Sequence, residues 1–347
     1  MNPSPDTFHR LAVIGAGAWG TSLAYHLGQK DYPIRLWAHE LETVKAIQHT
    51  RKNALFLPDI TLPETISPTS DFSEALQDCE AIVLAVPSHA MRTTIQRMHP
   101  HLKRPLPLII ATKGIEDGSL KLMSQVLLEE LSPEWEEQVF ILTGPSFAAE
   151  VCTGKPTTIL LSGQNLERAA SLQSLFMTPL FRVYTAQDLI GAQLGGSLKN
   201  VMAIASGVVD GLNLGFNARA ALITRGLVEM IRLGKAMGAH IHTFYGLSGL
   251  GDLVLTCTGT LSRNYSVGLK LGRGQTLQNI LAETNTVAEG VNTAKAASGL
   301  SAYYHADMPI VQAVNEILFQ EKAPLQAVSE LMVRASKVES EFPTMAN

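Results

Sequence analysis

The chain has 347 residues, which is long for one globular core and favours two domains. Hydrophobic residues make up 46% and charged residues 17%, which excludes a disordered protein. The net charge of −4 lacks the basic excess of nucleic-acid-binding proteins, so we expect no such partner. The three cysteines lie far apart without C-x-x-C spacing, which predicts a reduced, cytoplasmic protein without a metal site. Charges and glycines interrupt the helical stretches, so we expect no membrane insertion.

Short apolar runs alternate with helical patterns through the first half of the chain. The runs predict β-strands at residues 11–16, 34–39, 81–88, 108–114, 139–146, 157–163 and 181–185. Helical patterns between them cover residues 72–79, 119–131 and 165–176. Strands that are apolar on both faces and separated by helices indicate a parallel sheet covered on both sides. We therefore predict an α/β fold whose N-terminal part is a Rossmann-type doubly wound sheet.

After about residue 189 the β-branched runs give way to patterns rich in Ala, Leu and Gly. The predicted helices cover residues 190–212, 218–238, 277–284, 309–319 and 324–336. Gly238 is a suitable end for the second of them. We therefore expect a Rossmann domain at residues 1–188 and an all-α domain at residues 189–347.

A glycine motif joins the first predicted strand to the first helix. Gly15, Gly17 and Gly20 form the pattern G-x-G-x-x-G in the strand-to-helix context that a dinucleotide site requires. The first glycine permits a tight turn, the second lets the backbone approach a pyrophosphate, and the third lets the helix pack closely on the strand. The free N–H groups at the helix start favour phosphate. We therefore predict that the first domain binds a dinucleotide.

The end of the second strand reads WAHE, where dinucleotide-binding domains distinguish NAD from NADP. An acidic residue there binds the ribose 2′-hydroxyl of NAD, and a basic residue accepts the 2′-phosphate of NADP. His39 and Glu40 occupy this place, with His39 about 20 residues after the glycine loop. This mixed pattern favours dual use or NADP preference over strict NAD use.

Lys199 is the most informative residue of the second half. Its side chain should lean over Gly195 and Gly196 on the same helix. Two helical glycines cost about 1 kcal/mol each relative to alanine. Either they leave bare backbone for a ligand beneath the lysine, or they serve close helix packing while Lys199 reaches solvent. Asp252, near the start of a later helix, either caps that helix or is a hydrogen-bond partner of Lys199.

Three further polar segments suit an anionic ligand. Ser262, Arg263 and Asn264 place a guanidinium and an amide in a predicted turn, which is either a phosphate site or a surface turn. Lys113 and the segment 144–148 lie at the carboxyl ends of two predicted strands. Ligands of open α/β sheets bind at those ends, so both segments are expected at a binding site.

Together these segments closely resemble the bacterial-type NAD(P)-dependent glycerol-3-phosphate dehydrogenase family along nearly the whole chain. The matching strings, in the order of the family, are GAGAWGTSLA (15–24), AVPSHAMR (85–92), ATKGIE (111–116), TGPSFAAE (143–150), GAQLGGSLKNVMAIASGVVDG (191–211), NARAALITRGL (217–227), GLGDLVLTCTGTLSRN (249–264) and VAEGVNT (287–293). The resemblance implies reversible reduction of dihydroxyacetone phosphate to sn-glycerol 3-phosphate by NAD(P)H. It also implies a homodimer that supplies phospholipid synthesis.

The resemblance implies roles for individual residues as well. Lys199 matches the proton donor and acceptor of the reaction, and we expect Asp252 to share the catalytic site with it. The substrate contacts that it implies are Lys113, Gly144, Ser146, Lys199, Asp252, Ser262, Arg263 and Asn264. The cofactor contacts, besides the three loop glycines, are Ala18, Trp19, His39, Lys113, Ala148, Arg263, Val287 and Glu289. Position 18 varies in the family, so only its backbone role is implied.

The side-chain chemistry agrees with this reaction. When hydride reaches a ketone carbon, a protonated Lys199 can stabilise the growing alkoxide and donate a proton to it. In the reverse direction the lysine must be neutral, so a lowered pKa would help. Two other functions stay open: a related β-hydroxyacid dehydrogenase, with a carboxylate in place of the phosphate, and a non-catalytic NAD(P)-binding sensor. Arg263 in its polar turn favours a phosphate substrate, and Lys199 together with Asp252 argues against a sensor.

Overall fold

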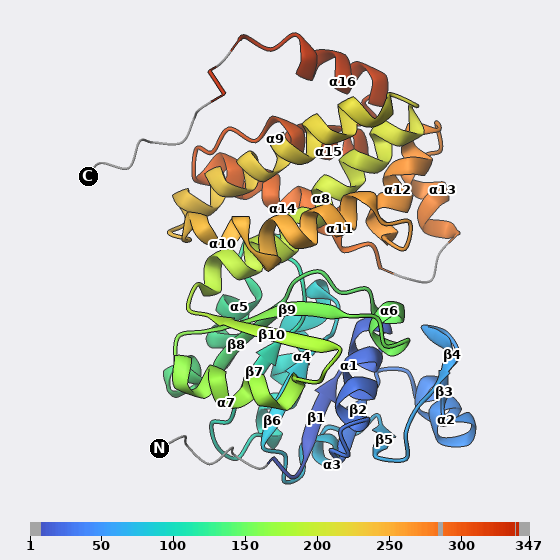
Figure 1. Ribbon diagram of the computed structural model, residues 1–347, viewed down its shortest axis with the longest axis vertical. Helices are drawn as coiled ribbons and strands as arrows, with labels where there is room; N and C mark the ends of the chain where they lie inside the picture. Colours follow the sequence, from blue (N-terminus) through green and yellow to red (C-terminus); the bar gives the residue numbers. More distant parts are fainter. Residues whose placement is uncertain (1–7, 284–286, 337, 340–347) are drawn as a thin grey trace.

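The computed structural model describes residues 8–283, 287–336 and 338–339. An N-terminal domain built on an eight-stranded sheet lies below an all-helical C-terminal domain (Figure 1). The expected α/β architecture, a Rossmann-type sheet followed by helices, is therefore confirmed. The last strand of the sheet ends at Ala186 and the first helix of the second domain begins at Leu189. A domain boundary placed after residue 188 stays a prediction.

The large sheet has the strand order β10-β9-β8-β7-β6-β1-β2-β5. Its strands are β1 (Leu11–Ile14), β2 (Ile34–Trp37), β5 (Ile66–Thr69), β6 (Ala81–Leu84), β7 (Leu108–Ile110), β8 (Val139–Thr143), β9 (Thr157–Gly163) and β10 (Phe181–Ala186). Every residue of β1, β6, β7 and β8 is buried, because helices cover both faces of the sheet. This explains why these strands are apolar runs and not alternating patterns.

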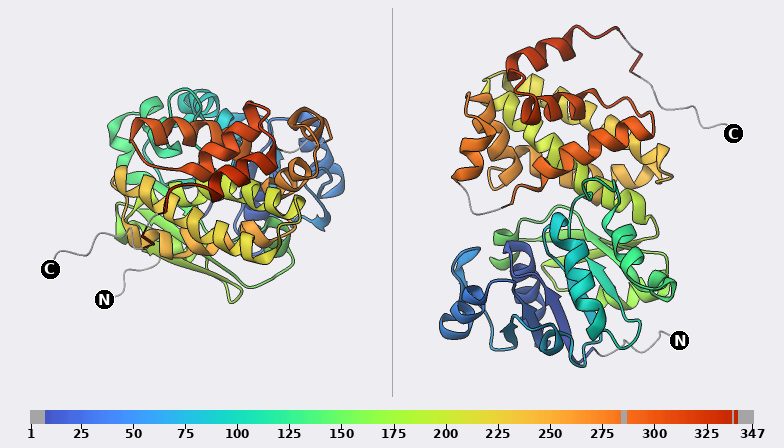
Figure 2. Two further views of the ribbon diagram at one scale, coloured as in Figure 1. Left: turned by 90° about the horizontal axis from the view of Figure 1, so that it is seen from above. Right: turned by 180° about the vertical axis from the view of Figure 1, so that it is seen from behind.

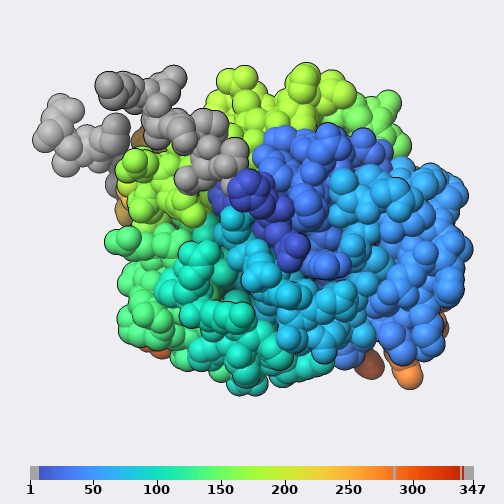
Figure 3. All heavy atoms as spheres, turned by 90° about the horizontal axis from the view of Figure 1, so that it is seen from below, coloured from blue at the N-terminus to red at the C-terminus, as the bar shows by residue number. Residues whose placement is uncertain are grey.

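Two hydrophobic cores lie on opposite faces of the sheet. Helices α1, α2 and α7 contribute to one core, and α3, α4 and α5 to the other. The helices of this domain are α1 (Ala18–Gly28), α2 (Leu41–Thr50), α3 (Phe72–Leu76), α4 (Met91–Met98), α5 (Met123–Glu130), α6 (Ala148–Cys152) and α7 (Leu166–Phe176). A separate antiparallel hairpin of β3 (Lys52–Asn53) and β4 (Leu57–Thr61) follows α2. Seen from below, the segment from α2 to β5 forms one flank of the domain (Figure 3).

The sheet departs from the sequence prediction at two places. Strands β8 and β9 run antiparallel, although a fully parallel sheet was expected. The link between these strands, residues 144–156, contains only the five-residue helix α6 and returns the chain antiparallel to β8. Strand β5 was not predicted, because it is only four residues long and contains Pro68. Proline is tolerated there because β5 is an edge strand of the sheet.

The C-terminal domain surrounds one long central helix. Its helices are α8 (Leu189–Gly211), α9 (Gly215–Ala236), α10 (Ile241–Tyr245), α11 (Asp252–Thr258), α12 (Arg263–Gly272), α13 (Leu277–Ala282), α14 (Glu289–Tyr303), α15 (Pro309–Phe319) and α16 (Pro324–Met332). Helix α8 is buried from Gly191 to Val209, because α9, α11, α12, α14 and α15 all pack against it. The predicted helix at 277–284 is α13, and residue 284 lies outside the described residues. Gly238 has φ +87° just after α9, as a helix-ending glycine should.

Glycines let α12 pack directly on the backbone of α8. A Cβ atom on Gly268 would lie 1.9 Å from the carbonyl oxygen of Ile204, and one on Gly207 would lie 2.1 Å from that of Tyr265. These glycines of α8 and α12 therefore serve contact between the two helices. Within the described part of the chain, no helix combines the length and apolar character needed to cross a membrane.

Candidate active site

Two lysines and one aspartate, of which Lys199 and Asp252 are buried and Lys113 is partly buried, form a group where the two domains meet. Asp252 has no exposed surface, and its Oδ2 atom lies 2.7 Å from the Nζ atom of Lys113. Its other oxygen, Oδ1, accepts a hydrogen bond from Nζ of Lys199, which is also buried. One carboxylate thus pairs with two ammonium groups, so the group carries net positive charge when both lysines are protonated.

Three separate segments bring these side chains together. Lys113 follows the carboxyl end of β7, Lys199 lies midway along α8, and Asp252 is the first residue of α11. The view from behind shows the helical domain covering one edge of the sheet, where these segments meet (Figure 2, right). The site therefore lies at the carboxyl ends of the strands, as expected for ligand binding in an open α/β sheet. The lysine and aspartate that the sequence singled out are in direct contact.

Other parts of the protein occupy the space beside the two glycines beneath Lys199. A Cβ atom on Gly195 would lie 2.3 Å from the carbonyl oxygen of Ser248, and one on Gly196 would lie 2.7 Å from Oγ1 of Thr143. Gly195 therefore serves close packing. The alternative hypothesis, that this glycine leaves its backbone free for a ligand, is wrong at this position. The expectation that packing would leave Lys199 reaching solvent is wrong too, because its side chain turns inward to an acidic partner.

Asp252 does not cap its helix. The N-cap position of α11 belongs to Gly251, which ends a short π-helical turn at Leu247–Gly251. Of the two expected roles for Asp252, the contact with Lys199 is the one observed. Thr256, one helical turn later, donates a hydrogen bond of 2.6 Å to the carbonyl oxygen of Asp252. This bond supports the first turn of α11 beneath the two lysines.

Burial gives Lys199 an unusual acidity. Desolvation lowers the pKa of its ammonium to about 7; Asp252 opposes this shift and the positive charge of Lys113 adds to it. A lysine with such a pKa has both protonated and neutral forms near neutral pH. It can therefore act as a proton donor and as a proton acceptor.

The turn that follows β8 adjoins Lys113. The carbonyl oxygen of Gly144 accepts hydrogen bonds from Nζ of Lys113 at 3.2 Å and from the hydroxyl of Ser146 at 3.0 Å. Gly144 has φ +128°, a conformation that favours glycine at this position. Ala148 opens helix α6 just beyond this turn. Lys113, Gly144 and Ser146 are thus assembled at one place.

The segment from Ser262 to Asn264 is the start of a helix and not the irregular polar turn that was expected. Ser262 is the N-cap of α12, and its hydroxyl accepts a hydrogen bond from the N–H of Tyr265. The amide of Asn264 donates to Oδ1 of Asn200 and accepts from the N–H of Gly290, both at 2.9 Å. Asn264 therefore joins three helices, and one of its partners is the neighbour of Lys199 in the chain.

Arg263 is exposed at the first position of α12. Its positive charge acts on the carboxylate of Glu289, the first residue of α14. Val287, also expected to contact the cofactor, lies just before that helix. Two oppositely charged side chains, Arg263 and Glu289, therefore lie near each other at the starts of α12 and α14.

The glycine loop has the geometry that the sequence predicted. Gly15 has φ +114°, and a Cβ atom there would lie 2.7 Å from the carbonyl carbon of Ala85. A Cβ atom on Gly20 would lie 1.8 Å from the carbonyl oxygen of Gly15, so helix α1 packs directly on the strand turn. At Gly17 a Cβ atom would meet nothing within 4 Å. The loop thus has one open face, beside the first turn of α1.

Ala18 and Trp19 form the first residues of that helix, and the indole of Trp19 packs at the edge of the core. His39 is exposed after β2, with its ring centroid 6.1 Å from that of Trp37. Strands β1 and β6 separate β2 from β7, the strand that leads to Lys113. The structure therefore does not bring His39 to the lysines. His39 lies farther along the same edge of the sheet.

Two residues of this region were not singled out from the sequence. Ser88 follows β6 and hydrogen-bonds to Glu289, and Asn200 hydrogen-bonds to Asn264. Ser88 stands at the end of a predicted strand, so the rule that places ligands at strand ends was the signal that could have identified it. Asn200 had no comparable signal beyond standing next to Lys199.

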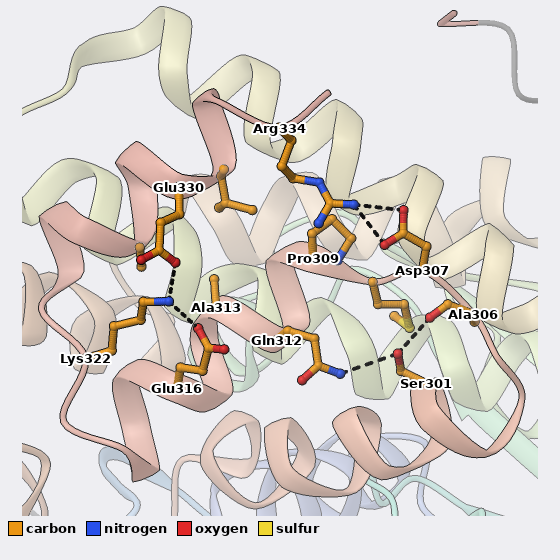
Figure 4. A pocket seen from close by; sticks show the side chains of 13 residues that line it. Ser301, Ala306, Asp307, Pro309, Gln312, Ala313, Glu316, Lys322, Glu330 and Arg334 are labelled. Carbon is orange, nitrogen blue, oxygen red and sulfur yellow. Dashed lines mark hydrogen bonds and ion pairs between the residues drawn. The ribbon is translucent and has the colours of Figure 1, made fainter. Parts of the chain in front are cut away.

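A separate pocket of about 280 Å³ lies between α14, α15 and α16. Figure 4 shows its charged side chains paired with each other: Arg334 with Asp307, and Lys322 with Glu316 and Glu330. These ion pairs hold α16 against the domain. We assign no ligand to this pocket.

Comparison with known proteins identifies relatives along both domains. The family model described as NAD-dependent glycerol-3-phosphate dehydrogenase N-terminus matches residues 10–169, and the C-terminus model matches residues 188–329. Glycerol-3-phosphate dehydrogenase (NAD(P)+) of Geobacter metallireducens is 49% identical over 330 residues, which cover 95% of this chain and 98% of that protein. The enzyme of the same name from Koribacter versatilis is 47% identical over 332 residues, with 95% and 98% covered.

The fold agrees with these relatives. The crystal structure of glycerol-3-phosphate dehydrogenase from Coxiella burnetii superposes with a TM-score of 0.90 and 39% sequence identity. The match covers 94% of this chain and 99% of that one, so both domains are shared.

Proposed function

Because the chain belongs to the NAD-dependent glycerol-3-phosphate dehydrogenase family, we propose that it interconverts dihydroxyacetone phosphate and sn-glycerol 3-phosphate with NAD(P)H. The observation that carries this proposal is the buried contact of Asp252 with both Lys199 and Lys113. Such a group supplies a proton at one nitrogen and a positive charge at the other, and ketone reduction beside a phosphate needs both.

Lys199 acts as the proton donor in this proposal. The nicotinamide, when bound, supplies the hydride that reduces the ketone carbon. The ammonium of Lys199 stabilises the negative charge that develops on the ketone oxygen and transfers a proton to it. In the oxidative direction the neutral amine takes the proton from the alcohol. A pKa of about 7 makes the lysine suitable for both directions near neutral pH.

Asp252 orients the two lysines through its separate oxygens. Lys113 and Arg263 are the cations that we assign to the substrate phosphate, with Gly144, Ser146, Ser262 and Asn264 around it. Because the carboxylate is buried and cannot turn to solvent, it holds both ammonium groups in place before substrate arrives. Arg263 is exposed and offers a planar guanidinium suited to bidentate phosphate contact.

We assign the dinucleotide to the open face of the glycine loop. Gly15, Gly17 and Gly20 fit it because two of them allow close backbone packing and the third leaves the loop accessible. The first turn of α1, with Ala18 and Trp19, presents N–H groups to the pyrophosphate. Further contacts of the dinucleotide in this proposal are His39, Lys113, Ala148, Arg263, Val287 and Glu289.

The cellular setting is part of the same proposal. We propose a cytoplasmic homodimer whose product feeds phospholipid synthesis, with the domain boundary after residue 188. Phe216, Tyr303 and Leu325 of the helical domain expose large apolar surfaces, which supports association of this domain with a partner copy. The oligomeric state can be measured by sedimentation.

The activity is tested by following oxidation of NADH and NADPH with dihydroxyacetone phosphate, and with 2-oxo and 3-oxo acids as alternatives. We expect turnover with the phosphate ketone, and the ratio of the two cofactors will define the contribution of His39. Lys199→Ala should lose at least about 100-fold in kcat. Lys295→Ala is the matched control, because this exposed lysine pairs with Asp117 away from the site.

The other outcomes distinguish the alternatives. Turnover with an oxo acid alone would indicate a β-hydroxyacid dehydrogenase and overturn the phosphate assignment of Arg263 and Lys113. Cofactor binding without turnover of any substrate would indicate a non-catalytic sensor. Near-normal activity of Lys199→Ala would overturn its assignment as the proton donor.

A further inference from the structure

Asn53 contacts the glycine loop from outside the main sheet. It belongs to strand β3 in the hairpin that follows α2, and only 1% of its surface is exposed. Its side-chain amide donates two hydrogen bonds of 2.8 Å, one to the carbonyl oxygen of Ala16 and one to the hydroxyl of Thr21. The Thr21 hydroxyl in turn donates to the same carbonyl at 3.2 Å. Both N–H groups of the Asn53 amide are therefore used at this loop.

The Ala16 carbonyl, which accepts from both Asn53 and Thr21, lies in the middle of the glycine motif. Ala16 separates Gly15 from Gly17, and its carbonyl belongs to the same peptide unit as the N–H of Gly17. In a trans peptide the C=O and N–H bonds point in opposite directions within one plane. Holding the Ala16 carbonyl towards Asn53 therefore turns the Gly17 N–H away from Asn53. All peptide bonds in the described residues are trans.

Hydrogen bonds of its own hairpin hold Asn53 in position. The N–H of Phe56 donates to the carbonyl oxygen of Asn53 at 3.2 Å, and the N–H of Leu62 donates to that of Arg51 at 2.7 Å. Arg51 also reaches back with its side chain to the carbonyl oxygen of Leu62 at 3.3 Å. The amide of Asn53 is therefore placed by a segment that lies between α2 and β5 and does not belong to the eight-stranded sheet.

We propose that Asn53 is a positioning residue for the dinucleotide: it holds the Ala16–Gly17 peptide so that the Gly17 N–H faces the pyrophosphate. Asn53 itself stays buried and does not contact the cofactor. This inference rests on the assignment of the dinucleotide to the glycine loop. It gives the β3–β4 hairpin a role in cofactor affinity.

The test is direct measurement of NAD(P)H binding by nicotinamide fluorescence, together with steady-state kinetics. For Asn53→Ala we expect the Kd and KM of NAD(P)H to rise about tenfold, because the Ala16 carbonyl loses one of its two side-chain donors and the other, the Thr21 hydroxyl, loses the hydrogen bond that orients it. The KM of dihydroxyacetone phosphate, and kcat at saturating cofactor, should change less than about twofold. Asn53→Asp should weaken cofactor binding further, because a carboxylate offers no donor to the Ala16 carbonyl and repels the pyrophosphate.

Thr65→Ala is the matched control for a purely structural effect. The hydroxyl of Thr65 donates to the carbonyl oxygen of Gly28 at 3.0 Å, at the opposite end of α1. This variant should lower the unfolding temperature without changing the Kd of NAD(P)H. Equal cofactor affinity of Asn53→Ala and wild type would overturn the positioning role alone. A wild-type protein that does not bind NAD(P)H would overturn the loop assignment and the positioning role together.

Discussion

Glu289 accepts two hydrogen bonds from Ser88, one from its backbone N–H at 2.9 Å and one from its hydroxyl. Ser88 follows β6 in the N-terminal domain, and Glu289 opens α14 in the helical domain, 201 positions later. Burial raises the pKa of the Glu289 carboxyl, and the bonds from Ser88 oppose that rise. Gly114 lies against this pair, since a Cβ atom there would be 2.4 Å from Cβ of Ser88. The contact therefore joins the two domains beside the proposed cofactor site.

Ser88→Ala should weaken the contact between the domains. A hydrogen bond from a hydroxyl to a charged group contributes about 1.5–3 kcal/mol, so we expect a loss of this size in the free energy of unfolding. Chemical denaturation without ligand measures it. Ser132→Ala is the control, because the Ser132 hydroxyl bonds to Glu134 at an exposed position within one domain. Equal stability of the two variants would contradict a domain-joining role for Ser88.

The pH dependence should be opposite in the two directions of the reaction. Lys199 is protonated below its pKa of about 7 and neutral above it. Reduction uses the protonated form, so its kcat/KM should fall as pH rises through about 7, and oxidation should rise over the same range. Rates measured in both directions with one buffer series check this. Profiles that rise or fall together would exclude Lys199 as the titrating group.

Gly268→Ala should strongly destabilise the helical domain. Its Cβ atom would lie 1.9 Å from the carbonyl oxygen of Ile204, so α12 must move away from α8. We expect a loss of about 2 kcal/mol or more, typical of overpacking in a core. Gly299→Ala, within α14, is the control: its Cβ would meet only the flexible end of Leu120, so gained helix propensity should offset most of the cost. Thermal unfolding compares them, and equal unfolding temperatures would show that α12 adjusts freely.

Glu229 should make stability depend on pH near neutrality. Its buried carboxylate accepts the N–H groups of Ile310 and Val311 at 2.7 and 3.2 Å, at the start of α15. Burial raises the pKa of Glu229 to about 7, and these N–H groups oppose the shift. The folded state thus holds the proton more tightly than the unfolded state, whose pKa is about 4.5. Its stabilising contribution is complete below about pH 4.5 and is lost as pH rises through about 7.

Glu229→Gln tests this linkage, because the amide keeps an oxygen acceptor and does not titrate. The stability of wild type relative to this variant should fall by a few kcal/mol between about pH 5 and pH 8. Denaturation at several pH values measures the difference. A constant difference over this range would show that Glu229 does not titrate there.

Local patterns were enough to predict much of this protein. The glycine loop, the central helix α8 and the segment that ends in Lys113 each depend on residues that are neighbours in the chain. Backbone conformation and hydrophobic periodicity act over a few residues, so strands, helices and the Rossmann-type order could be predicted from the sequence. Resemblance to a known family supplied the substrate and the residue roles, which no local pattern contains.

Contacts between distant residues were decided only by the tertiary structure. Asp252 bridges Lys113 and Lys199, which lie 139 and 53 positions away. Asn53 reaches a carbonyl 37 positions earlier, and the antiparallel pairing of β8 with β9 depends on how the chain returns after α6. A side chain's polar groups specify that it needs a partner once buried, but many donors and acceptors in the chain would satisfy it. Which partner it finds depends on how the helices and the sheet pack together.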